Sequence, residues 1–312
     1  MNSDTQKLRT VFMGTSPFAL PTLKALADSE EVIAVITQPD RPGGRGRRIL
    51  PPPVKELALT LGLHVQQPER VKDPHFIAQL GELGPELIVV AAFGQILPPA
   101  VLEVPPSGCI NVHPSLLPKY RGAAPINWAV INGEQRTGVT TYFMDEGMDT
   151  GAILLTKEVE IREAETAQEL GERLAGVGGE LLMETIKGLK EGPLQPIPQD
   201  EKWASYAPLL KKEDGLIQWG GEAGQIRNQI RGMVPWPVAY TWWGGRRIKV
   251  YRGGIGTGRG APGEILSLAG GIEVACGTGS LIIEELQLEG GRKIGWEEFA
   301  RGHRLTLGER LV

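Results

Sequence analysis

The chain has 312 residues, of which 41% are hydrophobic and 22% charged, as is ordinary for a soluble globular protein. This length exceeds what one hydrophobic core usually covers, so we expect two domains. The longest apolar run, residues 87–93, is too short to cross a bilayer, which argues against a membrane protein.

The first half of the chain alternates short apolar runs with helical patterns. One of these runs, at 87–92, shows no polar alternation, as expected of a strand that is covered on both faces. Strands that alternate with helices predict an α/β domain with a mostly parallel sheet. Thr166 and Glu169 form a capping-box pattern that predicts the start of a long helix. The predicted strands are 10–13, 32–36, 64–65, 87–92 and 110–112, and the predicted helices begin at Pro17 and cover 54–61, 76–83 and 166–189.

A proline-rich polar segment, EGPLQPIPQD at 191–200, separates two regions of different character. After it, a helical pattern at 225–233 is followed by short strand patterns and glycine-rich turns, which predict a small antiparallel barrel. The predicted strands of this barrel are 240–243, 247–251, 264–268, 272–275, 281–286 and 305–307. We therefore expect a first domain at 1–190, a linker at 191–206 and a second domain at 207–312.

The net charge of −4 is unevenly distributed along the chain. Residues 207–312 carry 14 Lys and Arg against 11 Asp and Glu, whereas the remainder carries 19 against 26. A mildly basic second domain on an acidic protein is compatible with a polyanionic partner, and ordinary scatter explains the difference as well.

Asn111 and His113 stand where an apolar run opens onto prolines and an arginine. They are two residues apart on an extended segment, so their side chains leave the same face of the sheet. Ligands of parallel α/β sheets bind at the carboxyl ends of strands, and His113 falls at such an end. A strand-like segment up to Met144 leads to Asp149 in a DTG turn, which can reach a neighbouring strand end.

An amide, an imidazole and a carboxylate that converge at strand ends suit acyl transfer. The Asn111 amide can donate to an oxygen that becomes anionic when a carbonyl is attacked. His113 can donate to the same oxygen or relay a proton, while Asp149 can hold the ring and help to deprotonate an amine. No GxSxG motif is present, so we expect the nucleophile to come from a second substrate. The pattern also fits a purely structural histidine, and spacing alone does not separate the two interpretations.

The segment SLLP at 115–118 places two leucines between a hydroxyl group and a proline. It can present backbone polar groups and an apolar wall to a flat heterocycle, or its leucines can pack into the core. Arg121 precedes a helical pattern at 123–131, and a helix N-terminus beside an arginine suits an anion.

Segments along nearly the whole chain resemble the 10-formyltetrahydrofolate-dependent formyltransferases and, within them, the methionyl-tRNA formyltransferases. The most specific is INVHPSLLPKYRGAAPINWAVINGEQRTGVTTYFMDEGMDTGAIL at 110–154, and the others lie at 11–26, 37–59, 205–219 and 225–250. The chain departs from the family pattern at Leu209, where a basic residue is usual, and at Gln218. Neither departure touches the expected reaction centre.

The resemblance implies a Rossmann-like domain with helices on both faces of the sheet, followed by an OB-like β-barrel domain that helps to hold tRNA. The reaction would transfer the formyl group of 10-formyltetrahydrofolate to the amino group of methionine on initiator tRNA, for translation initiation. It would need no metal and no nicotinamide. The implied catalytic residues are Asn111, His113 and Asp149, and the implied tetrahydrofolate-binding residues are Ser115, Leu116, Leu117 and Pro118.

Arginines cluster in DRPGGRGRR at 40–48, among glycines that let a backbone fit a ligand. In the family the matching loop enters the acceptor stem of the tRNA, whereas a solvated charged loop is the alternative interpretation. Basic residues also cluster along a predicted barrel strand and could follow a phosphate backbone. The predicted tRNA-binding residues are Arg41, Arg45, Arg47, Arg48, Arg246, Arg247 and Lys249, with Arg45 as the main contact.

Three other functions fit parts of the sequence. A formyltransferase for another amine, such as a ribonucleotide or an amino sugar, would share the three polar side chains but would need neither the arginine cluster nor the second domain. A nicotinamide-dependent dehydrogenase would need a glycine fingerprint after the first strand, where GTSPFAL at 14–20 has a single glycine. A non-catalytic RNA-binding module would not need all three polar side chains.

The two cysteines, Cys109 and Cys276, are too few for a disulfide framework and too far apart in sequence for a metal-ligand spacing. The first residues contain no apolar stretch of signal-peptide length. We therefore expect a cytoplasmic protein that works in a reducing compartment. The sequence leaves the oligomeric state open, and we favour a monomer.

Overall fold

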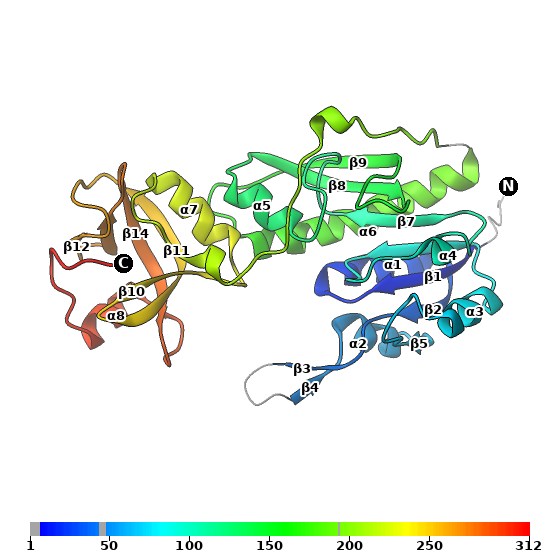
Figure 1. Ribbon diagram of the computed structural model, residues 1–312, viewed down its shortest axis with the longest axis horizontal. Coiled ribbons are helices and arrows are strands. Elements are labelled where there is room, and N and C mark those ends of the chain that lie inside the picture. The colour runs from blue at the N-terminus through cyan, green and yellow to red at the C-terminus, as the bar shows by residue number, and fades with distance from the viewer. Residues whose placement is uncertain (1–6, 44–47, 193) are drawn as a thin grey trace. The chain divides into compact units, whose positions relative to one another are not determined.

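The computed structural model describes residues 7–43, 48–192 and 194–312 (Figure 1). Its contacts divide the chain into two compact units. The N-terminal unit comprises residues 1–122, 136–160 and 171–206, and the C-terminal unit comprises 123–135, 161–170 and 207–312. Two short segments of the predicted first domain thus group with the second, and the sequence-based boundaries stay a prediction.

A seven-stranded mixed sheet forms the centre of the N-terminal unit, in the order β5-β2-β1-β6-β7-β8-β9. The first five strands of this order are parallel, and β8 and β9 are antiparallel to their neighbours. The mostly parallel sheet predicted from the sequence is therefore confirmed, and β7 lies where the parallel part meets the antiparallel edge. The strands are β1 (Arg9–Gly14), β2 (Glu31–Ile36), β5 (Val65–Gln66), β6 (Leu87–Ala91), β7 (Cys109–His113), β8 (Arg136–Phe143) and β9 (Ile153–Glu160).

The helices of this half of the chain begin at recognisable sequence signals. Helices α1 to α4 each carry a proline in the first turn, where a missing N–H breaks no intrahelical bond. Before α6, the Thr166 backbone N–H donates to Glu169 at 2.8 Å and the Glu169 N–H donates back to the Thr166 hydroxyl at 3.2 Å, so the capping box is confirmed. The helices are η1 (Pro17–Ala19), α1 (Leu20–Ser29), α2 (Pro53–Thr60), α3 (Pro74–Glu82), α4 (Pro99–Leu102), α6 (Ala167–Glu191) and η2 (Glu201–Trp203).

Both faces of the sheet are covered, which is why all five residues of β6 are buried. On one face, side chains such as Val11 and Ile88 share a core cluster with Phe76 of α3 and Val101 of α4. On the other face, α6 approaches so closely that a Cβ added to Gly178 would press on the Val112 side chain of β7. The layers of helix, sheet and helix agree with the predicted Rossmann-like architecture (Figure 1).

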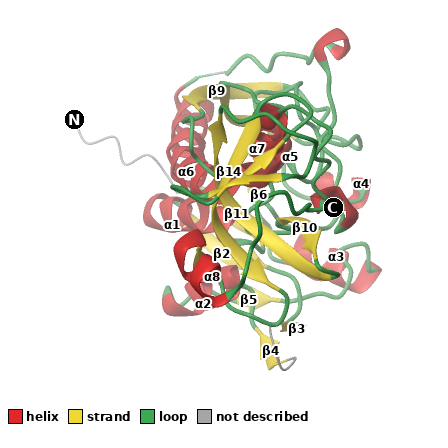
Figure 2. Ribbon diagram, turned by 90° about the vertical axis from the view of Figure 1, so that its left-hand side faces the viewer, coloured by secondary structure: helices red, strands yellow, loops and turns green. Residues whose placement is uncertain are grey.

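The C-terminal unit is built on an antiparallel sheet in the order β10-β11-β14-β13-β12, with β15 paired to β14. Its two long strands, β11 and β14, are prominent in Figure 2. This half-barrel confirms the small antiparallel β domain that the sequence predicts. Its strands are β10 (Ala239–Trp243), β11 (Arg246–Gly256), β12 (Ile265–Ser267), β13 (Ile272–Ala275), β14 (Ser280–Leu288) and β15 (Ile294–Gly295), and its helices are α5 (Pro125–Ile131), η3 (Glu213–Gly215), α7 (Ala223–Gly232) and α8 (Trp296–Gly302).

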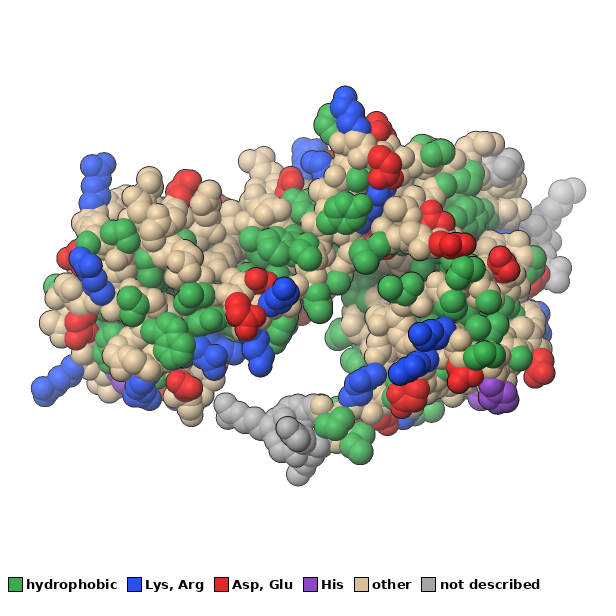
Figure 3. Space-filling view, in the orientation of Figure 1, with side chains coloured by type: hydrophobic (Ala, Val, Ile, Leu, Met, Phe, Trp, Pro, Cys, Tyr) green, Lys and Arg blue, Asp and Glu red, His purple; other side chains and the backbone are tan. Residues whose placement is uncertain are grey.

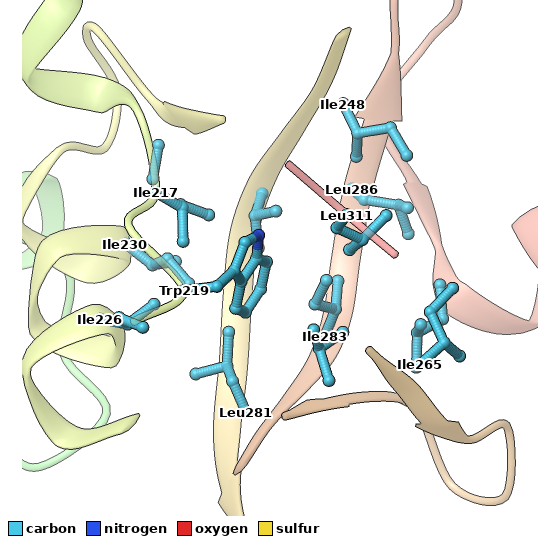
Figure 4. Packing of buried hydrophobic residues seen from close by; sticks show 14 of the residues in the cluster. Ile217, Trp219, Ile226, Ile230, Ile248, Ile265, Leu281, Ile283, Leu286 and Leu311 are labelled. Carbon is cyan, nitrogen blue, oxygen red and sulfur yellow. The ribbon is translucent and has the colours of Figure 1, made fainter. Parts of the chain in front are cut away.

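The hydrophobic core of this unit joins the concave sheet to α7. Trp219 lies between Ile226 and Ile230 of the helix on one side and Ile283 of β14 on the other (Figure 4). The indole N–H of Trp219 donates to the buried Thr241 hydroxyl at 2.9 Å, so this large ring buries no unpaired polar atom.

One predicted strand of this unit is wrong. Residues 305–307 form irregular structure and part of a turn, and the chain instead forms β15 and the short helix α8 just before them. Phe299 of α8 is fully buried in the sheet core, whereas Leu305 is only partly buried against it and Leu307 is exposed. A run of three residues with alternating polarity carries too little information to separate a strand from a turn.

Candidate active site

Asn111 and His113 lie on β7 with their side chains on the same face, as the sequence predicts. The strand pairs in parallel with β6 and antiparallel with β8, which fixes both residues in the middle of the sheet. His113 is the last residue of the strand and is only 4% exposed, whereas Asn111 is half-buried. The sheet therefore supports the His113 imidazole rigidly at the carboxyl end of the parallel strands.

The carboxylate of Asp149 reaches this strand end from the turn between β8 and β9. Its Oδ2 lies 3.7 Å from Nδ1 of His113 and accepts the backbone N–H of Gly122 at 2.7 Å. On the far side of the ring, Nε2 of His113 lies 3.0 Å from the Tyr120 carbonyl oxygen and must donate to it. The predicted imidazole and carboxylate therefore meet, with Nδ1 of His113 facing Asp149.

Tyr142 joins the amide to the carboxylate, a connection that the sequence analysis missed. Its hydroxyl donates to Oδ1 of Asp149 at 2.6 Å and accepts Nδ2–H of Asn111 at 3.0 Å. Because the hydroxyl proton is used on the carboxylate, the amide must present its NH2 group to the tyrosine, which fixes the orientation of Asn111. Burial, together with the negative charge of Asp149, raises the pKa of the Tyr142 phenol well above its usual value of 10.

We expect Tyr142→Phe to lower the turnover number of the formyl transfer that the resemblance implies about 10-fold, because both the amide and the carboxylate lose the group that orients them. The buried ring is kept, so the free energy of unfolding should fall by only about 1 kcal/mol. A matched control is Thr141→Val, which removes a neighbouring buried hydroxyl whose 2.7 Å bond runs to Thr185 of α6. Steady-state kinetics and thermal unfolding of both variants measure the effect; equal turnover in both would contradict it.

The loop after β7 is held by its own polar groups. The Ser115 hydroxyl donates to the Lys119 carbonyl at 2.6 Å, and the Thr140 hydroxyl of β8 donates to the Ser115 carbonyl at 2.7 Å. Ser115 and Leu117 are buried, whereas Leu116 and Pro118 are half-buried. In the predicted folate-binding segment, the side chains of Ser115 and Leu117 therefore shape the loop from inside.

Arg121 does not have the anion-binding role suggested by its position before a helix. Its side chain is 0% exposed, and its guanidinium donates to both carboxylate oxygens of Glu201 at 2.8 and 2.9 Å. It also donates twice to Oε1 of Gln199, at 3.1 and 2.8 Å. The guanidinium is used within the chain, which corrects the sequence-based expectation.

Burial also removes the two thiols from the chemistry. It raises the pKa of Cys109, at the start of β7, to about 12 and that of Cys276 to about 11. Both cysteines are free and buried. Neither thiol is therefore a nucleophile at neutral pH, which agrees with a reaction whose nucleophile comes from a substrate.

Comparison with known proteins shows the family of the chain. The chain matches the formyl transferase family over residues 8–186 and the formyl transferase C-terminal domain over residues 209–304. It is 56% identical over 306 residues to the methionyl-tRNA formyltransferase of Trichlorobacter lovleyi, with 97% of each chain covered. The chain belongs to the methionyl-tRNA formyltransferase family. The Acetivibrio thermocellus relative of the same name is 48% identical, covering 97% of this chain and 99% of its own.

Two solved structures share this fold at low sequence identity. The N-formyltransferase of Helicobacter canadensis, solved with folinic acid and dTDP-3-aminofucose, superimposes with a TM-score of 0.64 at 19% identity, covering 92% of this chain and 100% of its own. HypX from Aquifex aeolicus, solved with tetrahydrofolic acid, has a TM-score of 0.66 at 16% identity and covers 94% of this chain and 47% of its own. These likenesses concern the fold alone.

Two of the predicted RNA-binding arginines of the N-terminal unit, Arg41 and Arg48, lie on a pair of short strands, where the sequence predicts a loop. Strands β3 (Arg41–Gly43) and β4 (Arg48–Leu50) pair antiparallel, with Arg41 opposite Leu50. Arg41 is exposed, and Ile49 and Leu50 are exposed on the same hairpin. Arg45 and Arg47 fall outside the described residues, and of Arg48 only the backbone is described.

The predicted RNA-binding residues of the C-terminal unit lie on β11, beside aromatic rings of β10. Arg247 pairs across the strands with Trp242, and Lys249 pairs with Tyr240. The Arg247 guanidinium lies 5.7 Å from the centre of the Tyr240 ring, while Trp242 is 38% exposed. Arg246 is exposed and, by alternation, leaves the opposite face of the strand. On the face shown in Figure 3, basic side chains are interspersed with acidic ones. The basic residues there stand singly or in small groups and do not form one continuous positive surface.

A cavity of about 590 Å³ lies elsewhere in the N-terminal unit. It is lined by Leu8, Leu87 and Gly108, which precede or begin parallel strands, and by Phe143 and Lys190. It is therefore at the amino ends of the strands, away from Asn111 and His113. Among the residues that the structure describes, no three His, Cys, Asp or Glu side chains are grouped to hold a metal ion. Nor does any helix in that part of the chain combine the length and apolarity needed to cross a bilayer.

Proposed function

We propose that this chain transfers the formyl group of 10-formyltetrahydrofolate to the amino group of methionine on initiator tRNA. The observation that carries the proposal is the meeting of Asn111, His113 and Asp149 at the carboxyl end of β7, with the carboxylate 3.7 Å from the imidazole. The close relatives bear the name of this activity over 97% of the chain.

The three side chains suit attack by a neutral amine on a formyl carbon. Asn111 uses one amide N–H on Tyr142, so its other N–H is available to donate to the formyl oxygen as that oxygen becomes anionic. His113 uses Nε2–H on the Tyr120 carbonyl, so Nδ1 donates to the same oxygen when the imidazole is protonated and carries both N–H groups. Asp149 accepts the proton that the amine loses as the new C–N bond forms. When the bond between the formyl carbon and N10 of the donor breaks, that proton passes to N10, and tetrahydrofolate leaves.

The loop 115–118 supplies the best support for the folate donor. Leu116 packs on β8, since a Cβ added to Gly138 would overlap its side chain, and it remains half-buried beside Pro118. An apolar rim next to the strand end suits one face of a pterin ring, while backbone N–H and C=O groups can bond its edge. We assign Ser115 and Leu117 to holding this loop, and Leu116 and Pro118 to facing the ring.

The basic hairpin and the β10–β11 face suit the tRNA. Exposed Arg41 stands on a hairpin that also carries Arg48, and the predicted main contact Arg45 lies between them in sequence. On the half-barrel, Arg247 and Lys249 alternate with buried residues and stand next to Tyr240 and Trp242. Basic groups beside aromatic rings bind nucleic-acid backbones and unpaired bases. Arg246 and Arg47 complete the proposed set.

The test is formylation with a labelled formyl donor and a choice of acceptors. Charged initiator tRNA should be formylated, whereas free methionine, an amino-sugar nucleotide and glycinamide ribonucleotide should not. The amino sugar matters because a structural neighbour of this fold was solved with an amino-sugar nucleotide. Preferred formylation of any small amine would replace the proposed acceptor while keeping the site.

Binding of tRNA should weaken with salt, and Arg45→Ala should weaken it further. Each phosphate contact releases counterions, so loss of one contact should lower the slope of log K against log salt by about 1. A filter-binding or anisotropy titration at several salt concentrations measures both values. Arg9→Ala is a matched control, because that arginine donates to the Leu83 carbonyl within its own unit. An unchanged slope for Arg45→Ala would remove the loop from the interface.

We also propose a monomer in the cytoplasm. Each proposed catalytic side chain comes from one chain, within one compact unit, so the chemistry needs no second copy. An initiator tRNA is formylated where translation takes place. Light scattering during size-exclusion chromatography tests the oligomeric state against the chain mass of 33.8 kDa.

A further inference from the structure

Residues 197–206, which the sequence predicts as part of a linker, form a strap that is bonded to the active-site loops. At one end, Ile197 exchanges two backbone hydrogen bonds with Ile153 of β9, each of 2.8 Å. At the other end, the Ser205 hydroxyl accepts the Tyr120 N–H at 2.9 Å, and the Ser205 carbonyl accepts the Arg121 N–H at 2.8 Å. The strap therefore belongs structurally to the N-terminal unit, between β9 and the loop that follows β7.

Gln199, two residues after Ile197 in this strap, reaches the turn that carries Asp149. Its Nε2 donates to the Asp149 carbonyl at 2.8 Å and to the Gly151 carbonyl at 2.7 Å. Its Oε1 accepts two bonds from the Arg121 guanidinium. Since a guanidinium only donates, Oε1 must face Arg121 and the NH2 group must face the two carbonyls. All four of these hydrogen bonds thus have a single consistent orientation.

The turn that carries Asp149 needs the hydrogen bonds from Gln199 because its backbone adopts an energetically unfavourable conformation. Asp149 has a φ of 56°, in the left-handed region that residues other than glycine rarely adopt. A conformation of this kind persists only where the surroundings hold it. Tyr142 and Gly122 hold the carboxylate oxygens, and Gln199 holds the backbone on both sides of Thr150. The Gln199 amide therefore fixes the backbone from which the Asp149 side chain extends.

We propose that Gln199 is a positioning residue for the formyl transfer, and that it acts by holding the Asp149 turn against β7. The inference rests on the proposed function, because it assigns a role in the same reaction. Arg121 and Glu201 support it: the carboxylate bonds of Glu201 raise the pKa of the buried guanidinium, which stays charged and directs the amide of Gln199.

Two substitutions separate this role from simple support of Arg121. Gln199→Glu keeps an acceptor for the guanidinium but puts a carboxylate oxygen against the Asp149 and Gly151 carbonyls, which it cannot bond. Gln199→Met keeps the length of the side chain and removes every hydrogen bond. We expect each to lower the turnover number about 10-fold, with the Michaelis constants for donor and tRNA changed by no more than about twofold, since only the geometry of a catalytic group is altered.

A double-mutant cycle tests whether the effect passes through the carboxylate. In an Asp149→Ala background, Gln199→Glu should change the residual single-turnover rate by less than about twofold, because the group that it positions is gone. Asp200→Ala is the matched control, since the carboxylate of that neighbouring residue accepts the Lys202 N–H at 3.0 Å, within the strap itself. Its turnover number should stay within about twofold of the wild-type value.

The outcomes are distinct. A full 10-fold loss from Gln199→Glu in the Asp149→Ala background, or normal turnover in Gln199→Glu, overturns the proposal. If both Gln199 variants lose the native circular dichroism spectrum, the residue is required for folding and the proposal is again overturned. If the wild-type protein itself does not formylate charged initiator tRNA, the proposed function fails, and that result is seen before any variant is made.

Discussion

His113→Ala should lower single-turnover formylation of charged initiator tRNA at least about 100-fold, because removing one donor to a developing oxyanion typically costs about 10²–10³ in rate. The imidazole is held by the Tyr120 carbonyl at the end of a buried strand. Alanine at this position of β7 has no N–H that could donate to the oxyanion in its place. Asn111→Ala and Asp149→Ala should act in the same direction. Rapid-quench measurements with saturating donor report the chemical step without product release.

The loss must be separated from unfolding. His113 is only 4% exposed, and its replacement by alanine both opens a cavity and leaves the Tyr120 carbonyl without this partner, so the free energy of unfolding should fall by about 2–4 kcal/mol. His75→Ala is the matched control, since this exposed histidine lies on α3 of the same unit. A His113→Ala protein that formylates within a few-fold of the wild type would show that the imidazole has no catalytic role.

The sequence predicts the position of this site because two of its polar residues, Asn111 and His113, belong to the apolar run that forms the strand. The buried strand β7 is an apolar run interrupted by Asn111 and ended by His113, and period-two alternation places both on one face. The parallel order of strands then puts that face at the edge where ligands bind. Asp149 was placed near it by its turn sequence, and the 3.7 Å separation agrees with that expectation.

What the sequence could not predict is which distant residues complete the site. Tyr142 stands opposite Asn111 only because of the register between β7 and β8, and two antiparallel strands of similar composition do not fix their register by composition alone. Gln199 and Arg121 are 78 residues apart in sequence, and nothing in either local segment announces the pairing. The polar, proline-rich composition of 191–200 predicts an exposed segment, and it does not show that the Gln199 amide is bonded to the Asp149 turn.

The hairpin of β3 and β4 shows a different limit. Glycines and arginines at 40–48 read as a loop, because strand propensity there is low. The pairing of Pro42 with Ile49 is local and short, so a small number of backbone bonds decides it against the composition. Charge and turn residues could therefore predict an exposed segment, but not its conformation.

Gly151→Ala should cost both stability and activity, since this glycine lies where the Asp149 turn enters β9. A Cβ at Gly151 would overlap the carbonyl oxygen of Phe143, which is backbone of β8 and cannot turn aside as a flexible side chain could. We expect the free energy of unfolding to fall by about 2–3 kcal/mol, the upper part of the range for overpacking.

The same overlap should lower the turnover number about 100-fold, because the turn that it displaces also carries the catalytic carboxylate, and a shift near 1 Å has an effect of that size. Gly81→Ala is the matched control: the site of its Cβ is open and helical, so that variant should be as active as the wild type and slightly more stable. Denaturant unfolding and single-turnover kinetics on both proteins decide the matter. A Gly151→Ala protein with full activity would mean that the turn tolerates displacement, and that Asp149 does not need the close approach between β8 and β9 to reach His113.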